Sequence, residues 1–270
     1  MAPASSSAGD ADGLLRDGDI EGARAALVEA VRTRPADPQA RMFLFQLLAV
    51  AGEWEKAAKQ LAALAKLSPE AQMLSVVYGQ AIAAEIVRAD VFAGRAPMNQ
   101  LVASGWAEGL VEAIPRFAAG DAEGAAARRD AAFDAAPDTP GSLDGENFEW
   151  LADADSRFGP SFEAIIAGQY GLVPFDVVER IESEGPKDLR DIVWYPVQIA
   201  FRGGQSVAAF LPARYPGSES DLDNAVRLAR TTGWADAPSG QVGSGQHLWV
   251  LSTGEERGLL SLRLLAFERG

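Results

Sequence analysis

The chain has 270 residues, of which 24 are lysine or arginine and 38 are aspartate or glutamate, so its formal charge at neutral pH is −14. This charge disfavours nucleic acid and anionic membranes as partners, and the absence of cysteine excludes disulfides, thiolate catalysis and cysteine-based metal sites. The single histidine, His247, excludes a histidine-rich metal centre. Residues 1–9 contain neither a basic segment nor an apolar run, and the most apolar stretch, residues 71–92, is interrupted by polar and charged residues. We therefore expect a cytoplasmic protein without an export signal or a membrane-spanning helix.

One hexapeptide of the chain occurs twice. Residues 18–23 read Gly-Asp-Ile-Glu-Gly-Ala and residues 120–125 read Gly-Asp-Ala-Glu-Gly-Ala, and the offset of 102 residues is three times 34. Gly52 lies 34 residues after Gly18. The same period relates three prolines, which lie 34 and then 68 residues apart: Pro35, Pro69 and Pro137. A period of 34 residues with a helix–turn–helix pattern is typical of tetratricopeptide (TPR) repeats, whose usual role is to hold another polypeptide.

In chain order, residues 1–12 are small and polar and are predicted to be a disordered tail. Residues 13–140 are predicted to form a TPR-like helical repeat domain of about four units with one continuous core. Helices are expected over residues 20–34, 37–50, 54–65, 73–92, 106–117 and 121–133. The helix over 73–92 replaces the third unit, whose turn position is Ile86, and its apolar residues on nearly all sides predict a buried helix.

Turn-forming and acidic residues dominate 134–147, which we interpret as a domain boundary. Beyond it, residues 148–270 are predicted to form a β-rich C-terminal domain with one short helix over 222–230. Strands are expected over residues 162–167, 170–174, 193–201, 206–211, 247–252 and 258–267, and residues 177–182 are expected to form a further strand or a short turn. The predicted fold class is therefore α+β, with an N-terminal TPR-like helical repeat domain followed by a mainly antiparallel β domain.

No stretch of the chain carries a catalytic, cofactor-binding or metal-binding motif. A calcium loop starting at Asp153 fails, because its sixth position is Phe158 and its twelfth is Ala164. The glycine-rich residues 240–245 lack the lysine of a phosphate loop and the frame of a serine elbow, and are interpreted as a flexible loop. A lone histidine on a strand is more often structural than catalytic, although a hydrolase using His247 or the Asp153/Asp155 pair stays open as a weaker hypothesis.

Four phrases in the second half are specific: residues 155–163 (DSRFGPSFE), 188–196 (DLRDIVWYP), 211–219 (LPARYPGSE) and 243–246 (GSGQ). With the helical repeats in front of them, they make the chain resemble the ImpE/SciE/TagJ family, the accessory proteins of the bacterial type VI secretion system. The resemblance implies a non-enzymatic adaptor without a cofactor, which binds an N-terminal helix of the small sheath subunit. It also implies a role in sheath assembly, or in sheath recycling by an AAA+ ATPase.

Partner contacts are expected in two places. The concave face of a helical repeat array can receive an amphipathic helix. Aromatic and arginine residues of the second half are candidate partner anchors, although the same residue types also fill small β cores: Arg157, Trp194, Arg214, Tyr215 and Trp234. An alternative function for such an array is that of a TPR-type chaperone for a secreted effector.

Overall fold

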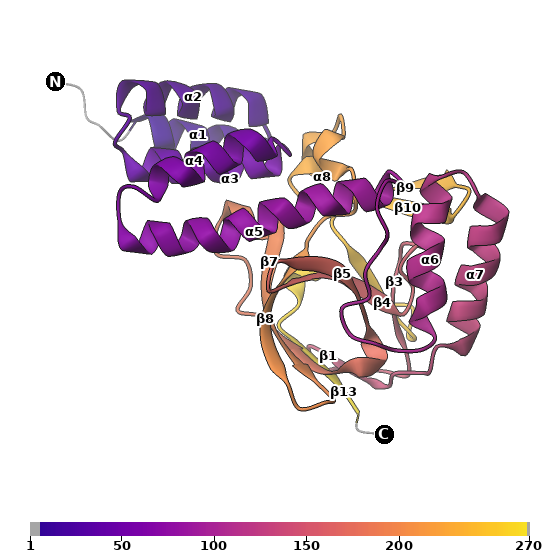
Figure 1. Cartoon of the computed structure of the whole chain (residues 1–270). Helices are drawn as coiled ribbons and strands as arrows, with labels where there is room; N and C mark the ends of the chain where they lie inside the picture. Colours follow the sequence, from indigo (N-terminus) through magenta and orange to yellow (C-terminus); the bar gives the residue numbers. More distant parts are fainter. Residues whose placement is uncertain (1–5, 269–270) are drawn as a thin grey trace.

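The structure is a computed structural model that describes residues 6–268 of the chain (Figure 1). Seven helices form its first half: α1 (Ser6–Arg16), α2 (Ile20–Thr33), α3 (Pro38–Val50), α4 (Trp54–Leu64), α5 (Pro69–Phe92), α6 (Ala107–Ala118) and α7 (Ala122–Ala135). None of the helices within residues 6–268 combines the length and the apolarity needed to cross a bilayer.

The repeated hexapeptide is a helix-starting motif. Gly18 takes the left-handed conformation at φ 85°, and the Asp19 carboxylate then accepts a hydrogen bond of 2.8 Å from the Gly22 amide, which caps α2. Asp121 caps α7 in the same way, with a 3.1 Å bond from the amide of Gly124. The alanine that ends each motif is fully buried, so the paired helices approach closely at this position.

The helices do not form one continuous array. The hairpins α1–α2 and α3–α4 stack over the first half of α5, whereas the α6–α7 hairpin lies at the far end of α5, apart from them (Figure 1). The predicted stack of about four units is therefore interrupted, although residues from all seven helices belong to one hydrophobic cluster, as the prediction of a continuous core requires. The third place in the stack is taken by α5, which packs against the β half through Tyr78, Ile82 and Arg88 instead of pairing with a helix of its own.

Two predicted boundaries also differ from the structure. The predicted tail is helical from Ser6, because Ala11 and Leu15 lie four residues apart on one face of α1 and are both buried in the core; residues 1–5 lie outside the described chain. The predicted linker over 134–147 contains β1 and most of β2. Asp144 and Gly145, with φ of 50° and 94°, make the two-residue turn that joins these strands.

The second half is built from antiparallel strands, with a short helix α8 (Asn224–Arg227). The strands are β1 (Gly141–Leu143), β2 (Glu146–Phe148), β3 (Leu151–Asp153), β4 (Ser161–Ile166), β5 (Gln169–Pro174), β6 (Val178–Glu182), β7 (Trp194–Phe201), β8 (Ser206–Pro212), β9 (Thr232–Ala237), β10 (Gly240–Gly245), β11 (Leu248–Leu251), β12 (Glu256–Gly258) and β13 (Leu264–Phe267). The main sheet has the order β2-β1-β13-β6-β7-β8-β4-β5, while β12-β11-β3 and β10-β9 form two smaller sheets.

Two of the sequence expectations for the β half are wrong. Residues 240–245, interpreted as a loop, form β10 and pair with β9 along their whole length. The strand expected over 258–267 is split: Gly258 ends β12 in the small sheet, and β13 joins the main sheet.

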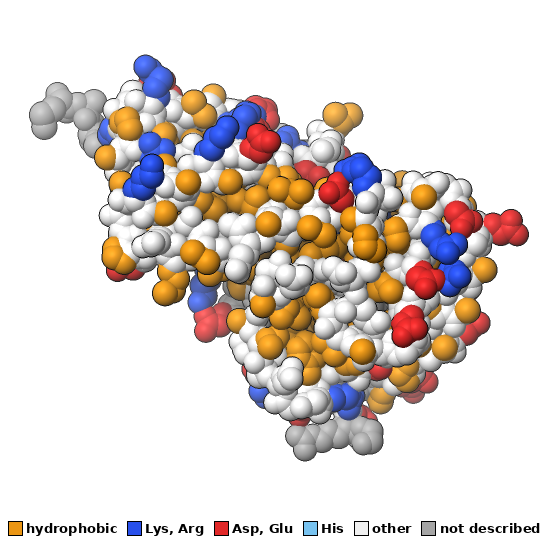
Figure 2. Space-filling view, viewed as in Figure 1, with side chains coloured by type: hydrophobic (Ala, Val, Ile, Leu, Met, Phe, Trp, Pro, Cys, Tyr) orange, Lys and Arg blue, Asp and Glu red, His pale blue; other side chains and the backbone are white. Residues whose placement is uncertain are grey.

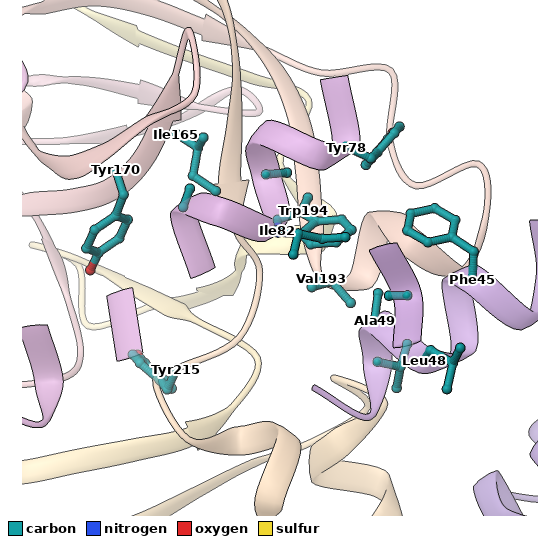
Figure 3. Packing of buried hydrophobic residues seen from close by; sticks show 14 of the residues in the cluster. Phe45, Leu48, Ala49, Tyr78, Ile82, Ile165, Tyr170, Val193, Trp194 and Tyr215 are labelled. Carbon is teal, nitrogen blue, oxygen red and sulfur yellow. The ribbon is translucent and has the colours of Figure 1, made fainter. Parts of the chain in front are cut away.

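The hydrophobic core is continuous across the two halves of the chain. One cluster joins Leu27 and Phe45 of the helices to Trp194 and Tyr215 of the β half, and a second fills the main sheet. Figure 3 shows part of the shared cluster, with Phe45, Tyr78 and Trp194 converging from three elements. The change from helix to strand near residue 140 is therefore a change of structure type and does not separate two cores.

Candidate functional site

Most of the five residues expected to anchor a partner lie inside the protein. Trp194 and Tyr215 have no exposed surface and Arg214 has 4%, so a partner cannot reach these three side chains in this structure. Arg157 is largely covered, with 15% of its side chain exposed, and Trp234 on β9 is 38% exposed beside the Tyr215 ring. Arginine and aromatic residues were candidates for both surface and core positions. In the structure, Arg157, Trp194, Arg214 and Tyr215 lie mainly where the helical half packs on the β half, a region here called the joint.

Trp194 fastens β7 to three helices. Its ring lies 6.4 Å from that of Phe45 on α3, 5.9 Å from Trp54 on α4 and 5.6 Å from Tyr78 on α5. Its indole nitrogen donates a hydrogen bond of 3.1 Å to Glu85. A buried tryptophan with a satisfied N–H is a rigid packing element.

Arg214 and the loop after it hold the turn of the second hairpin. The Arg214 guanidinium donates a 2.9 Å hydrogen bond to the carbonyl of Val50 at the end of α3, where the helix dipole favours a cation. Burial lowers the pKa of Arg214 to about 10, so the side chain stays charged at neutral pH. Glu219 packs directly on Gly52, the turn glycine of this hairpin, where a Cβ would come within 2.5 Å of Glu219 Cγ.

The first hairpin is held in the same way by residues around α8. Asn224 donates a 2.8 Å hydrogen bond to the carbonyl of Gly18. Arg230 donates to the carbonyls of Leu15 and Arg16 at the end of α1. The glycine turns of the first two repeats are therefore docking points for the β half.

A short segment of the β half also covers the helical repeats. The 3₁₀ turn Leu189–Ile192 packs on α3, and the Arg190 guanidinium lies 4.6 Å from the centre of the Tyr78 ring. All residues of α3 from Leu44 to Val50 are buried. The open trough that the repeat pattern led us to expect is therefore absent along α3, because the chain's own residues fill it.

A buried chain of charged groups connects α5 to the β half. Arg88 donates two hydrogen bonds of 2.7 Å to the two carboxylate oxygens of Glu163 on β4, and a third of 2.7 Å to the carbonyl of Arg214. His247 then bridges two carboxylates, with Nε2 at 3.0 Å from Glu163 and Nδ1 at 2.7 Å from Asp153. Tyr215 donates a 2.8 Å hydrogen bond to Asp153.

The protonation states follow from these contacts. Burial opposes the charged form of His247, but the carboxylates of Asp153 and Glu163 outweigh it and raise the pKa of His247 to about 9. Burial likewise opposes ionisation of Glu163, but Arg88 outweighs it and lowers the pKa of that carboxyl. The network therefore contains an imidazolium and a guanidinium around an ionised Glu163 at neutral pH.

This geometry does not offer His247 as a catalytic base. Both ring nitrogens are engaged by carboxylates, and 4% of the side chain is exposed. Asp155 is likewise bound, by Arg157 and by the amide of Gly243. Within residues 6–268 the side chains form no group of three or more acidic or histidine residues suited to a metal ion.

Two cavities flank α5. One, of about 340 Å³, is lined by charged side chains of the joint, Glu85, Arg88, Arg157 and Glu219, together with Trp54 and Phe92. The other, of about 240 Å³, lies between α5 and the strands β4, β7 and β8 and is lined without any charged side chain.

The exposed apolar face of α5 was not predicted from the sequence. Because the residues of α5 are apolar on nearly all sides, the sequence predicted a buried helix, and any side facing solvent would ordinarily be the one with its charged residues. The structure reverses this, since Glu85 and Arg88 point inward while apolar side chains lie outside. The exposed ones are Met73 (73%), Val76 (58%), Val77 (40%), Ile86 (49%) and Val87 (40%). Figure 2 shows hydrophobic side chains along the course of α5.

Known proteins resemble this chain over nearly its whole length. The profile of the ImpE protein family matches residues 145–266, and a tetratricopeptide repeat profile matches residues 14–77. The type VI secretion system accessory component TagJ of Pseudomonas aeruginosa is 42% identical over 259 residues, which cover 96% of this chain and 91% of TagJ. The crystal structure of a Vibrio parahaemolyticus protein superposes with a TM-score of 0.85 at 24% identity, over 97% of this chain and 98% of that one, which confirms the fold. The chain therefore belongs to the ImpE/TagJ family of type VI secretion system accessory proteins.

Proposed function

We propose that this protein is a non-enzymatic, cytoplasmic adaptor of the type VI secretion system, which binds an N-terminal helix of the small sheath subunit. In this role it assists assembly of the sheath or its recycling by the AAA+ ATPase. The observation that carries the proposal is the row of exposed apolar side chains on α5, because exposed apolar patches mark protein-binding sites.

The rest of the molecule supports this role. The ion network and the Trp194 cluster hold α5 on the β half, and the two docked turns hold the first two hairpins on it. A rigid scaffold lowers the entropic cost of binding a flexible segment. An amphipathic helix that lays its apolar face on a groove is a common recognition mode for such a surface. Trp234, which stays partly exposed on β9, is a candidate for a second, smaller contact.

The test is co-purification with the small sheath subunit, followed by deletion of the N-terminal helix of that subunit. The expected result is a stoichiometric complex that the deletion abolishes, and addition of the ATPase then shows whether a ternary complex forms. Unchanged binding after the deletion refutes the helix-binding role. Retention of a secreted effector in place of the sheath subunit favours the chaperone function.

A further inference from the structure

We infer that the outer face of α5 is the surface on which the partner's amphipathic helix packs. This inference rests on the proposed function and specifies where on the protein the partner binds. Five residues form one line along the exposed side of the helix, here called the α5 stripe: Met73, Val76, Gln80, Ala83 and Val87. All are exposed, and Val77 and Ile86 widen the stripe on its two sides.

The spacing of the α5 stripe is that of a helix–helix seam. Its members are separated by 3, 4, 3 and 4 residues, the alternation with which one helix meets another at a crossing angle of about 20°. From Met73 to Val87 the stripe rises about 21 Å, at ~1.5 Å per residue, so it matches a partner helix of about four turns. Two small residues leave room for close approach: Ala83, and Gly79, where an added Cβ would meet no atom within 4 Å.

The apolar cavity beside the stripe gives the partner helix an anchor point. Val77 and Gln80 form its α5 wall, while Val197 and Phe210 belong to the opposite wall. Gln80 itself packs on Gly168 in the turn between β4 and β5, so stripe and cavity are continuous. The volume of about 240 Å³ exceeds the ~150 Å³ that accommodates a benzene ring. One large apolar side chain of the partner can therefore enter it.

The distribution of charge around the α5 stripe limits which partner helix can bind there. Neither the α5 stripe nor the lining of the adjoining cavity carries a charged side chain, and the two charges in this part of α5, Glu85 and Arg88, are turned inward. The partner's contact face must therefore be uncharged, since a charge there would be desolvated without a counter-charge. The chain as a whole has a formal charge of −14. This field favours a helix whose outer face is basic.

The test uses the full chain and a fluorescent peptide of the small sheath subunit's N-terminal helix, with binding followed by anisotropy. Val76→Glu/Val87→Glu and Val76→Lys/Val87→Lys are both expected to weaken binding by about a hundredfold or more, because each site loses an apolar contact and desolvates a charge. Val28→Glu is the matched control, since Val28 is 49% exposed on α2, and it is expected to bind like the wild type. A scrambled peptide of the same composition should not bind.

The outcomes separate the inference from the function it rests on. Wild-type affinity in both double variants, with peptide binding intact, overturns the inference about α5 but leaves the adaptor role standing. Failure of the wild type to bind the peptide refutes the adaptor role itself. Loss of binding in the lysine variant alone, with gain in the glutamate variant, shows an electrostatic contact and overturns the apolar seam. Self-association that both variants abolish identifies a second copy as the occupant and also overturns the inference.

Discussion

Arg88 is the residue through which α5 is tied most directly to the β half, and Arg88→Met tests this tie. The substitution keeps most of the aliphatic volume and removes the guanidinium. Glu163 then loses both of its 2.7 Å hydrogen bonds from Arg88, and the carbonyl of Arg214 loses a third. His247 remains beside Glu163, so the carboxylate is left half-neutralised in a buried site.

The expected loss is set by the burial of the pair. Arg88 is 6% exposed and Glu163 is 3% exposed, so solvent cannot replace the missing partner. Removing one member of such a buried pair lowers the free energy of unfolding by about 3–5 kcal/mol. This is a large part of the roughly 5–15 kcal/mol available to a folded domain. Arg88→Lys should lose less, because it restores the charge but not the two-point geometry.

Equilibrium urea unfolding, followed by far-ultraviolet circular dichroism, measures these changes. A double-mutant cycle with Glu163→Gln completes the experiment, and the double variant should be more stable than the sum of the single losses predicts by about 1–3 kcal/mol. A loss below about 1 kcal/mol in Arg88→Met, or simple additivity in the cycle, refutes the role of this pair as the tie between α5 and the sheet.

Three further predictions follow from the contacts between the helices and the β half. The pKa of His247 is about 9 in the folded protein and ~6.5 in the unfolded chain. The stabilisation by His247 is therefore complete below pH ~6.5 and is lost as the pH rises through 9. Unfolding at several pH values should show that the free energy of unfolding falls by roughly 3 kcal/mol, a fall that His247→Gln removes. Gly52→Ala should lower the melting temperature more than Gly120→Ala. Both glycines have positive φ, but only Gly52 is packed on Glu219, so equal effects would contradict the docked turn. Because one core spans both halves, urea unfolding should show a single transition by circular dichroism and by tryptophan fluorescence, and separate transitions would contradict the shared core.

Local patterns were sufficient to predict most of the secondary structure. The glycine, aspartate and proline positions mark helix ends through φ angles and caps, and α3, α4, α6 and α7 begin and end within a few residues of the predicted ranges. The β7–β8 hairpin was likewise readable from its two-glycine turn. These features depend on neighbours in the sequence, so the sequence contains them directly.

The joint could not be predicted because its contacts are distant in the sequence. His247 meets Asp153 and Glu163 across 94 and 84 residues, and its residue type alone gave no sign of two carboxylate partners. The missed β10 strand has a similar cause. Its glycines were interpreted as flexibility, but the backbone at Gly243 lies against the Tyr215 ring, where a Cβ would come within 2.3 Å. Whether a glycine gives flexibility or close approach depends on what packs against it.

The four phrases by which the chain resembles its family all lie in the joint between the halves. Residues 155–163 include Glu163 of the ion network, residues 188–196 include Trp194, residues 211–219 include Arg214, and residues 243–246 pack against Tyr215 and the α8 segment. These residues act by fixing how α5 lies on the sheet, since most of them have no surface to offer a partner. The same placement turns the charged face of α5 inward and its apolar stripe outward. The proposed binding function therefore rests on the exposed face of α5, and substitutions there should change binding without changing folding.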